Sequence, residues 1–280
     1  MILHIFVDPP RVAFFVPFLN YPIAWYGILF GLGFALALRV FQHLCDWRPF
    51  SLFTGEQIAS RITNFMMVGI LVGARLFHIV FYESLDWLQN DPLRPFKFWE
   101  GGLASHGGIL CSIFSCLLFV YIYRIPFFKL LDRIFPCAMI LGGCIRIGNF
   151  MNQEILGLKT ELPWGLVFQT PQSLSSIGLY PRHPVQIYES FFYFALFFLG
   201  CVLLKNRSKT GVAASCLGLL MSVGRFLVEF LKEDQSFYTL GLPLNMGQIL
   251  SIPLIILFAT ILALAYNERL QEPFRARLNQ

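Results

Sequence analysis

The chain has 280 residues, of which 56% are hydrophobic, 13% are charged and 31 are phenylalanine. A soluble domain usually carries about 25% charged residues and cannot bury this much apolar side chain, so the composition excludes a soluble globular protein and indicates a polytopic membrane protein. The net charge of +5 fits the positively charged loops of such a protein, so no nucleic-acid partner is expected.

The N-terminal segment, residues 1–20, is apolar but interrupted by Pro9, Pro10 and Pro17, which predicts an interfacial or loop segment. It has no basic region followed by a cleavage site, so we expect no cleaved signal peptide. A membrane-spanning helix needs about 20 mostly apolar residues. Seven later stretches qualify, so the sequence predicts an all-α polytopic membrane protein that forms a single integral membrane domain over 1–280. Its seven predicted helices cover 21–42, 62–82, 103–123, 130–149, 185–204, 212–231 and 246–266.

Two longer polar regions, 83–102 and 150–184, separate some of these helices and are rich in Pro, Gly and Trp, which is typical of ordered loops at a membrane surface. Twelve of the 21 Lys and Arg residues fall on the opposite side of the membrane from these loops, and six fall on the same side. Because the more positive side faces the cytoplasm, we expect the N-terminus and both long loops outside and the C-terminus inside.

The seven cysteines form no CxxC pair and lie mostly within apolar stretches, which predicts free thiols with no disulfide and no zinc site. A thiol nucleophile is the less favoured alternative, because no basic residue lies beside any cysteine. No carboxylate cluster has metal-ligand spacing, so neither a metal nor another cofactor is expected.

Three arginines lie within or at the edge of predicted helices, where a charged side chain is costly and usually marks a function or an ion pair. They are Arg75, Arg146 and Arg225. Asn149 lies three residues after Arg146, and Glu229 four residues after Arg225, so each pair shares a helix face. Internal ion pairing or snorkelling would also explain these arginines. Gathered in a lipid-accessible cavity, their planar guanidinium groups would suit a phospholipid phosphate.

A histidine framed by glycines occurs at the start of the third predicted helix, in GGLASHGG, residues 101–108. His106 could act as a general base, because histidine titrates near neutral pH without a shifted pKa. The alternative is structural, with Gly107 and Gly108 as helix-packing residues and His106 in an interhelical hydrogen bond.

Five motifs follow one another along the chain: GGLASHGG, CIRIGNFMNQE, RHPVQIYE, VGRFLVEFLKED and NMGQILSIP. In this order they resemble the signatures of the prolipoprotein diacylglyceryl transferase family, from Tyr26 to Pro253. The resemblance implies a seven-helix enzyme of the bacterial inner membrane. It would move the diacylglyceryl group of phosphatidylglycerol to the thiol of the lipobox cysteine of a prolipoprotein, releasing glycerol phosphate.

By the same resemblance, three residues match catalytic positions and the two long loops match an outward arm (83–102) and a head (150–184). The catalytic positions are His106, Arg146 and Arg225, and the further substrate-binding positions are Tyr26, Asn149, Glu154, Gly157 and Glu229. We expect His106 to act as base and the two arginines to stabilise the departing phosphate. Glu229 would hold Arg225, and Asn149 would orient Arg146 or the glycerol head group.

The chain departs from the family pattern at two positions. Cys144 replaces a glycine two residues before Arg146, and Met221 stands four residues before Arg225, where some members have tyrosine. A tyrosine base at that position is therefore in doubt, which favours His106 or the leaving phosphate itself as the proton acceptor. The remaining glycines near Arg146 are expected to make room for a lipid phosphate. An anion transporter or channel, a different membrane enzyme and a scaffold without chemistry are the rival functions, and a monomer is the expected state.

Overall fold

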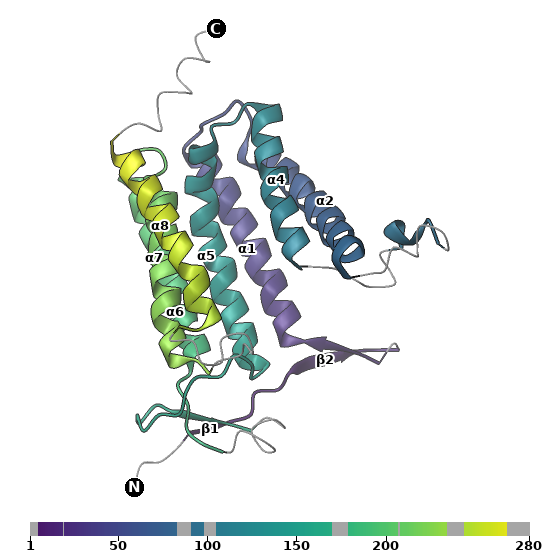
Figure 1. The fold of residues 1–280 in the computed structure, drawn as a ribbon, viewed down its shortest axis with the longest axis vertical. Coiled ribbons are helices and arrows are strands. Elements are labelled where there is room, and N and C mark those ends of the chain that lie inside the picture. The colour runs from purple at the N-terminus through teal and green to yellow at the C-terminus, as the bar shows by residue number, and fades with distance from the viewer. Residues whose placement is uncertain are drawn as a thin grey trace. The chain divides into compact units, whose positions relative to one another are not determined.

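The computed structural model describes residues 5–18, 20–82, 91–97, 105–169, 179–206, 208–233 and 244–267. For residues 81, 82, 105, 106 and 109 it describes the backbone alone. These ranges contain seven α-helices (Figure 1): α1 (Trp25–Trp47), α2 (Gly55–Tyr82), α4 (Ser105–Tyr123), α5 (Phe127–Met151), α6 (Val185–Lys205), α7 (Val212–Val228) and α8 (Met246–Tyr266). Each helix overlaps one of the seven predicted stretches, although α2 begins seven residues earlier than predicted. The overlap confirms the all-α polytopic membrane fold.

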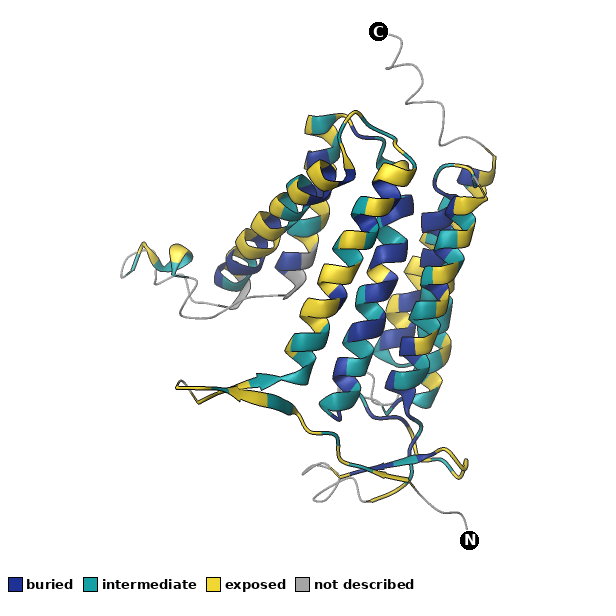
Figure 2. Cartoon of the chain, turned by 180° about the vertical axis from the view of Figure 1, so that it is seen from behind, coloured by how far each residue is buried: buried dark blue, intermediate teal, exposed yellow. Residues whose placement is uncertain are grey.

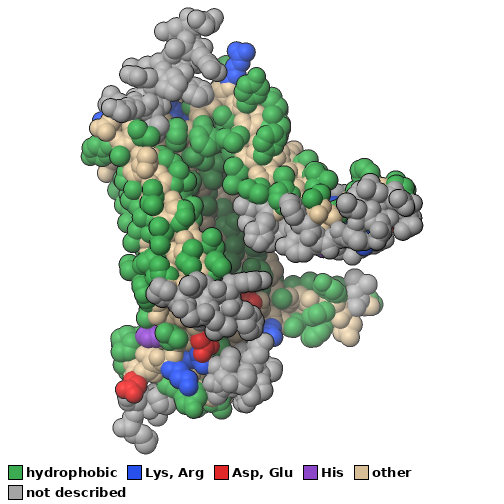
Figure 3. All heavy atoms as spheres, in the orientation of Figure 1, with side chains coloured by type: hydrophobic (Ala, Val, Ile, Leu, Met, Phe, Trp, Pro, Cys, Tyr) green, Lys and Arg blue, Asp and Glu red, His purple; other side chains and the backbone are tan. Residues whose placement is uncertain are grey.

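Six of these helices are long and apolar enough to cross a membrane, and the seventh, α4, has 19 residues. Figure 2 shows many exposed residues along these helices. Among them are large hydrophobic side chains, whose exposure would be unfavourable in water. On α8, Leu250 is 60% exposed and Ile256 61% exposed. In the space-filling view, hydrophobic side chains cover most of the helical part, whereas a group of charged side chains lies at its lower end (Figure 3). The exposed faces are therefore suited to lipid.

The helix ends follow local sequence signals. Helix α6 begins directly after Pro184, and α7 begins after Gly211, whose φ of 87° is a backbone conformation that favours glycine. Helix α8 begins with a capping box, in which Asn245 accepts a hydrogen bond from the backbone of Gln248 and the Gln248 side chain accepts one in return. Helix α7 ends at Val228 and continues as one 3-10 turn, η4 (Glu229–Leu231).

The N-terminal segment forms short strands, which corrects the start of the first predicted helix. Strand β2 (Val12–Val16) pairs antiparallel with β3 (Tyr21–Ala24), and β1 (Ile5–Val7) pairs parallel with β4 (Leu166–Phe168). Helix α1 therefore starts at Trp25 rather than at residue 21. The physical reason is the hairpin turn, in which Phe18 and Asn20 have positive φ values of 70° and 46°, conformations incompatible with a helix.

The chain divides into two compact units. The first contains Met1–Val40 and Leu131–Gln280, and the second contains Phe41–Leu130. In the first unit α7 packs between α6 and α8, with a buried core that includes Met139, Leu196 and Leu217. In the second unit α2 packs against α4.

The described part of the arm loop is residues 91–97, which contain the 3-10 turn η1 (Arg94–Phe96). The described parts of the head loop contain β4 and three isolated backbone bridges, among them Gly157 to Lys232. The rest of both predicted loops lies outside the described residues.

Candidate active site

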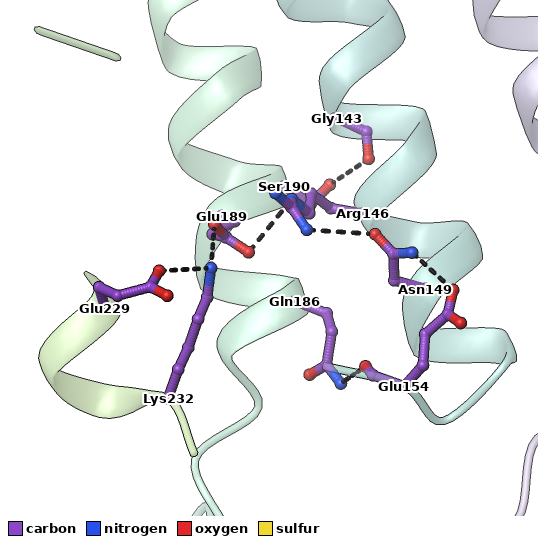
Figure 4. A network of polar contacts seen from close by, with 9 residues as sticks. All are labelled: Gly143, Arg146, Asn149, Glu154, Gln186, Glu189, Ser190, Glu229 and Lys232. Carbon is purple, nitrogen blue, oxygen red and sulfur yellow. Dashed lines mark hydrogen bonds and ion pairs between the residues drawn. The ribbon is translucent and has the colours of Figure 1, made fainter. Parts of the chain in front are cut away.

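Arg146 lies at the centre of a network of polar side chains where α5 ends and α6 begins (Figure 4). Its Nη1 donates a hydrogen bond to Asn149 Oδ1 at 3.3 Å, and its Nε forms an ion pair with Glu189 Oε2 at 3.1 Å. The Arg146–Asn149 contact confirms that the two residues share a face of α5. The guanidinium is therefore held by two helices, and its Nη2 has no partner among the described residues.

Asn149 is itself fixed by the segment that follows α5. Its Nδ2 donates to Glu154 Oε1 at 2.7 Å, and the backbone carbonyl of Glu154 accepts a 2.7 Å hydrogen bond from Gln186 Nε2. Gln153 and Ile155 have positive φ values of 53° and 58°, which reverse the chain just past the helix. This turn brings the exposed Glu154 back to the buried Asn149, so Glu154 positions the residue that orients Arg146.

Lys232 extends the network toward α7. Its Nζ lies 2.8 Å from Glu189 Oε1 and 3.3 Å from Glu229 Oε2, and its side chain is 5% exposed. Glu189, whose side chain is 4% exposed, thus serves both Arg146 and Lys232. Two positive and two negative side chains alternate in the order Arg146, Glu189, Lys232, Glu229. We refer to these four residues as the charge chain.

Two members of the charge chain, Glu189 and Lys232, were not among the predicted site residues. Glu229 and Lys232 are three residues apart, so their contact is visible in the sequence EFLK. The contact between Glu189 and Lys232 joins residues 43 apart and has no sequence signal. The i, i+3 spacing could have drawn attention to Lys232, but only the fold identifies Glu189 as the shared carboxylate.

The expected ion pair between Arg225 and Glu229 is wrong for the described part of the chain, because the Glu229 carboxylate pairs with Lys232. The physical reason is Lys232, whose buried ammonium lies 3.3 Å from Glu229 Oε2 and needs carboxylate partners. Glu229 instead lies against the first turn of α8, where a Cβ on Gly247 would be 2.4 Å from its carboxyl carbon. The half-buried side chain of Arg225 makes no hydrogen bond or ion pair within the described ranges.

The glycines near Arg146 accommodate aromatic rings, which corrects the expectation that they leave room for a phosphate. A Cβ on Gly143 would lie 2.8 Å from the ring of Phe194, and one on Gly148 would lie 2.8 Å from the ring of Tyr26. These glycines let α6 and α1 approach α5 closely. Tyr26 is thereby brought against α5 at Gly148, and its role in the site stays a prediction.

Gly157 occupies a backbone position with no space for a side chain. A Cβ there would lie 2.3 Å from the carbonyl oxygen of His183. Its own carbonyl accepts a 2.9 Å hydrogen bond from the buried Arg182, and its backbone pairs with that of Lys232. Gly157 therefore connects the head loop to the charge chain through the main chain.

In the second unit, Arg75 is 2% exposed and donates hydrogen bonds to the backbone carbonyls of Arg94 and Pro95. This contact corrects the expectation that Arg75 faces a lipid phosphate, because the side chain holds the arm instead. The side chain of His106 lies outside the described residues, so its role stays a prediction. A Cβ on Gly107 would lie 2.3 Å from the carbonyl oxygen of Gly73, which supports a packing role for that glycine.

All seven cysteines are free thiols. Within the described ranges, no group of three His, Cys, Asp or Glu side chains is arranged to hold a metal ion.

Seven apolar helices, with buried charges gathered where α5 and α7 end and α6 and α8 begin, define a multi-pass membrane protein with a polar site near one end of its helices. The family profile described as prolipoprotein diacylglyceryl transferase matches residues 11–264. The chain belongs to this family, whose members are enzymes of the transferase class.

Relatives named phosphatidylglycerol–prolipoprotein diacylglyceryl transferase align over most of the chain. The relative from Tolumonas auensis is 38% identical over 255 residues, which cover 89% of this chain and 94% of the relative. The relative from Chlamydia caviae is 39% identical over 85% of both chains. The relative from Chlamydia trachomatis is 34% identical over 94% of this chain and 98% of its own length.

Proposed function

We propose that this protein transfers the diacylglyceryl group of phosphatidylglycerol to the lipobox cysteine of prolipoproteins, the first step of bacterial lipoprotein maturation. The names of its relatives support this reaction. The observation that carries the proposal is the state of Arg146. Its Nε and Nη1 are held by Glu189 and Asn149, while its Nη2 end has no partner among the described residues and can donate to a phosphate.

At the reacting glycerol carbon, one bond forms and one breaks. The cysteine sulfur of the prolipoprotein attacks the glycerol carbon that bears the phosphate ester, and a carbon–sulfur thioether bond forms. The carbon–oxygen bond to phosphate breaks, and glycerol phosphate leaves with the bonding electrons. The thiol proton passes to a general base, because a free cysteine has a pKa of about 8.5 and its thiolate is the nucleophile. The enzyme must therefore accept one proton and stabilise one departing anion.

We assign proton acceptance to His106 and stabilisation of the phosphate to Arg146 and Arg225. Preorganised donors act most strongly where charge develops in the transition state. The fixed guanidinium of Arg146 meets this requirement, and Arg225 has no internal partner among the described residues. Met221, packed on the buried core of the first unit, cannot supply a proton-accepting hydroxyl.

The other matched residues would support substrate binding in different ways. Asn149 would hold Arg146, and Tyr26, packed against Gly148 of α5, would contact the head group. Glu154 and Gly157 would shape the segment after α5. Glu229 would act through its ion pair with Lys232.

The topology that fits this chemistry places the site on the outer side of the bacterial inner membrane. The charge chain lies where α5 ends and α6 begins, and this is the end of the helices that the distribution of Lys and Arg assigns to the outside. The N-terminus would then lie outside and the C-terminus in the cytoplasm. We propose a monomer that forms one integral membrane domain and uses no nucleic-acid partner and no cofactor.

The test is a transfer assay with purified protein in liposomes that contain phosphatidylglycerol and a lipobox peptide. The expected products are diacylglyceryl peptide and glycerol phosphate in equal amounts. A peptide with serine in place of cysteine is the matched control and should consume no lipid. Lipid consumption without peptide, or peptide modification without phosphatidylglycerol, would contradict the proposal.

A further inference from the structure

Lys232 and Glu189 form a deeply buried contact within the network, and Glu229 adds a second carboxylate to it. The side chains of Lys232 and Glu189 are 5% and 4% exposed, and that of Glu229 is 16% exposed. A buried ammonium is costly unless it is paired and hydrogen-bonded. Lys232 meets this condition with one carboxylate from α6 and one from η4. The charge of Lys232 is therefore directed at protein carboxylates.

Lys232 determines how Glu189 can act on Arg146. Glu189 offers Oε1 to Lys232 at 2.8 Å and Oε2 to Arg146 Nε at 3.1 Å. The lysine thus fixes the orientation of the carboxylate that holds the guanidinium. Without a positive charge at position 232, the buried Glu189 carboxylate would lose its nearest cation, and its orientation toward Arg146 would no longer be fixed. This change would release Nε of Arg146.

The backbone of Lys232 is held as firmly as its side chain. The residues on both sides of it bond to the head loop, with Leu158 N donating to Leu231 O at 2.8 Å and Glu233 N donating to Leu156 O at 3.2 Å. Gly157 pairs with Lys232 between these two bonds. The ammonium is therefore delivered to the carboxylates by a fixed piece of main chain.

We propose that Lys232 is a positioning residue for the transfer reaction, acting on Arg146 through Glu189. The inference rests on the proposed function, because it concerns the arginine assigned to the phosphate. Lys232 acts through its charge. An arginine at this position therefore supports the transfer reaction, and a neutral side chain of similar length does not.

The experiment compares Lys232→Arg, Lys232→Met and Lys232→Gln in the transfer assay, with the exposed Lys159→Met as the matched control. Preorganisation matters most where charge develops, so the loss should fall on kcat more than on KM for phosphatidylglycerol. We expect Lys232→Met and Lys232→Gln to lower kcat by about 30-fold or more and to change KM by less than about 5-fold. Lys232→Arg and Lys159→Met should keep kcat within about 3-fold of the wild type.

Three results overturn the proposal. One is a folded neutral variant with kcat near the wild-type value. Another is a Lys232→Arg variant as inactive as Lys232→Met at an unchanged melting temperature. The third is a loss confined to KM. The Lys232→Arg result tests the proposal even where the neutral variants melt below the assay temperature. Failure of the proposed function is distinguishable, because the wild-type protein itself would then transfer no diacylglyceryl group.

Discussion

Replacing Glu189 by glutamine removes the shared charge of the charge chain while keeping the size of the side chain. Glu189 Oε2 and Oε1 lie 3.1 Å from Arg146 Nε and 2.8 Å from Lys232 Nζ, and the Glu189 side chain is 4% exposed. Removing one partner of a buried ion pair costs about 3–5 kcal/mol. For a chain of this size that corresponds to a fall in melting temperature of roughly 5–15 °C.

The effect of Glu189→Gln on catalysis follows from the same contact. Arg146 would keep its hydrogen bond to Asn149 but lose the ion pair at Nε. A misplacement of about 1 Å at a catalytic group costs about 10²-fold in rate, so we expect kcat to fall by about that factor.

The assay pairs a thermal melt of the purified protein with steady-state transfer to a lipobox peptide. The exposed Glu161→Gln is the matched control and should change neither quantity. A melting temperature within 1–2 °C of the wild type, together with kcat within about 3-fold, would refute the assignment of Glu189 as the anchor of Arg146.

Further outcomes are expected at other sites. Gly143→Ala should lower the melting temperature by an amount equivalent to about 1–3 kcal/mol, since its Cβ would lie 2.8 Å from the Phe194 ring. Gly142→Ala, whose Cβ would meet its nearest neighbour at 3.5 Å, should be nearly neutral in the same melt. Asp132→Ala should lower the free energy of unfolding by about 1–3 kcal/mol, because this buried carboxylate accepts two backbone N–H bonds, at 2.8 and 2.9 Å, at the start of α7. An unchanged melting temperature would contradict its capping role. His106→Gln should abolish most transfer while the protein stays folded, and strong residual activity would assign His106 a structural role instead.

The helices could be predicted from sequence because each depends on a property that is local in the chain. A run of about 20 apolar residues is enough to identify a spanning helix, and α6 and α8 match the predicted ranges to within one residue. The first helix was predicted to begin four residues too early. Its preceding segment is also apolar, and only the hairpin geometry at Phe18 and Asn20 separates strand from helix.

The candidate site was predictable where its contacts are local. Arg146 and Asn149 share a face because they are three residues apart, and Glu154 follows five residues after Asn149. The i, i+4 spacing did not predict the partner of Glu229, because its carboxylate contacts Lys232, three residues further along the chain.

Contacts between distant segments were beyond the sequence. The ion pair between Glu189 and Lys232 and the aromatic ring against Gly143 depend on how α6 packs against its neighbours. A glycine beside an arginine reads the same in sequence whether it admits a ligand or a phenylalanine ring. Packing decides between these uses, and here it favours the ring.

The most direct test of the account is the transfer rate of Arg146→Ala and Arg225→Ala, measured on a lipobox peptide with the amount of inserted, folded protein held equal. If both arginines stabilise the departing phosphate, each variant should lose at least about 10²-fold in kcat while keeping a melting temperature that allows the assay. A near wild-type rate in either variant would contradict the central claim that both arginines stabilise the departing phosphate.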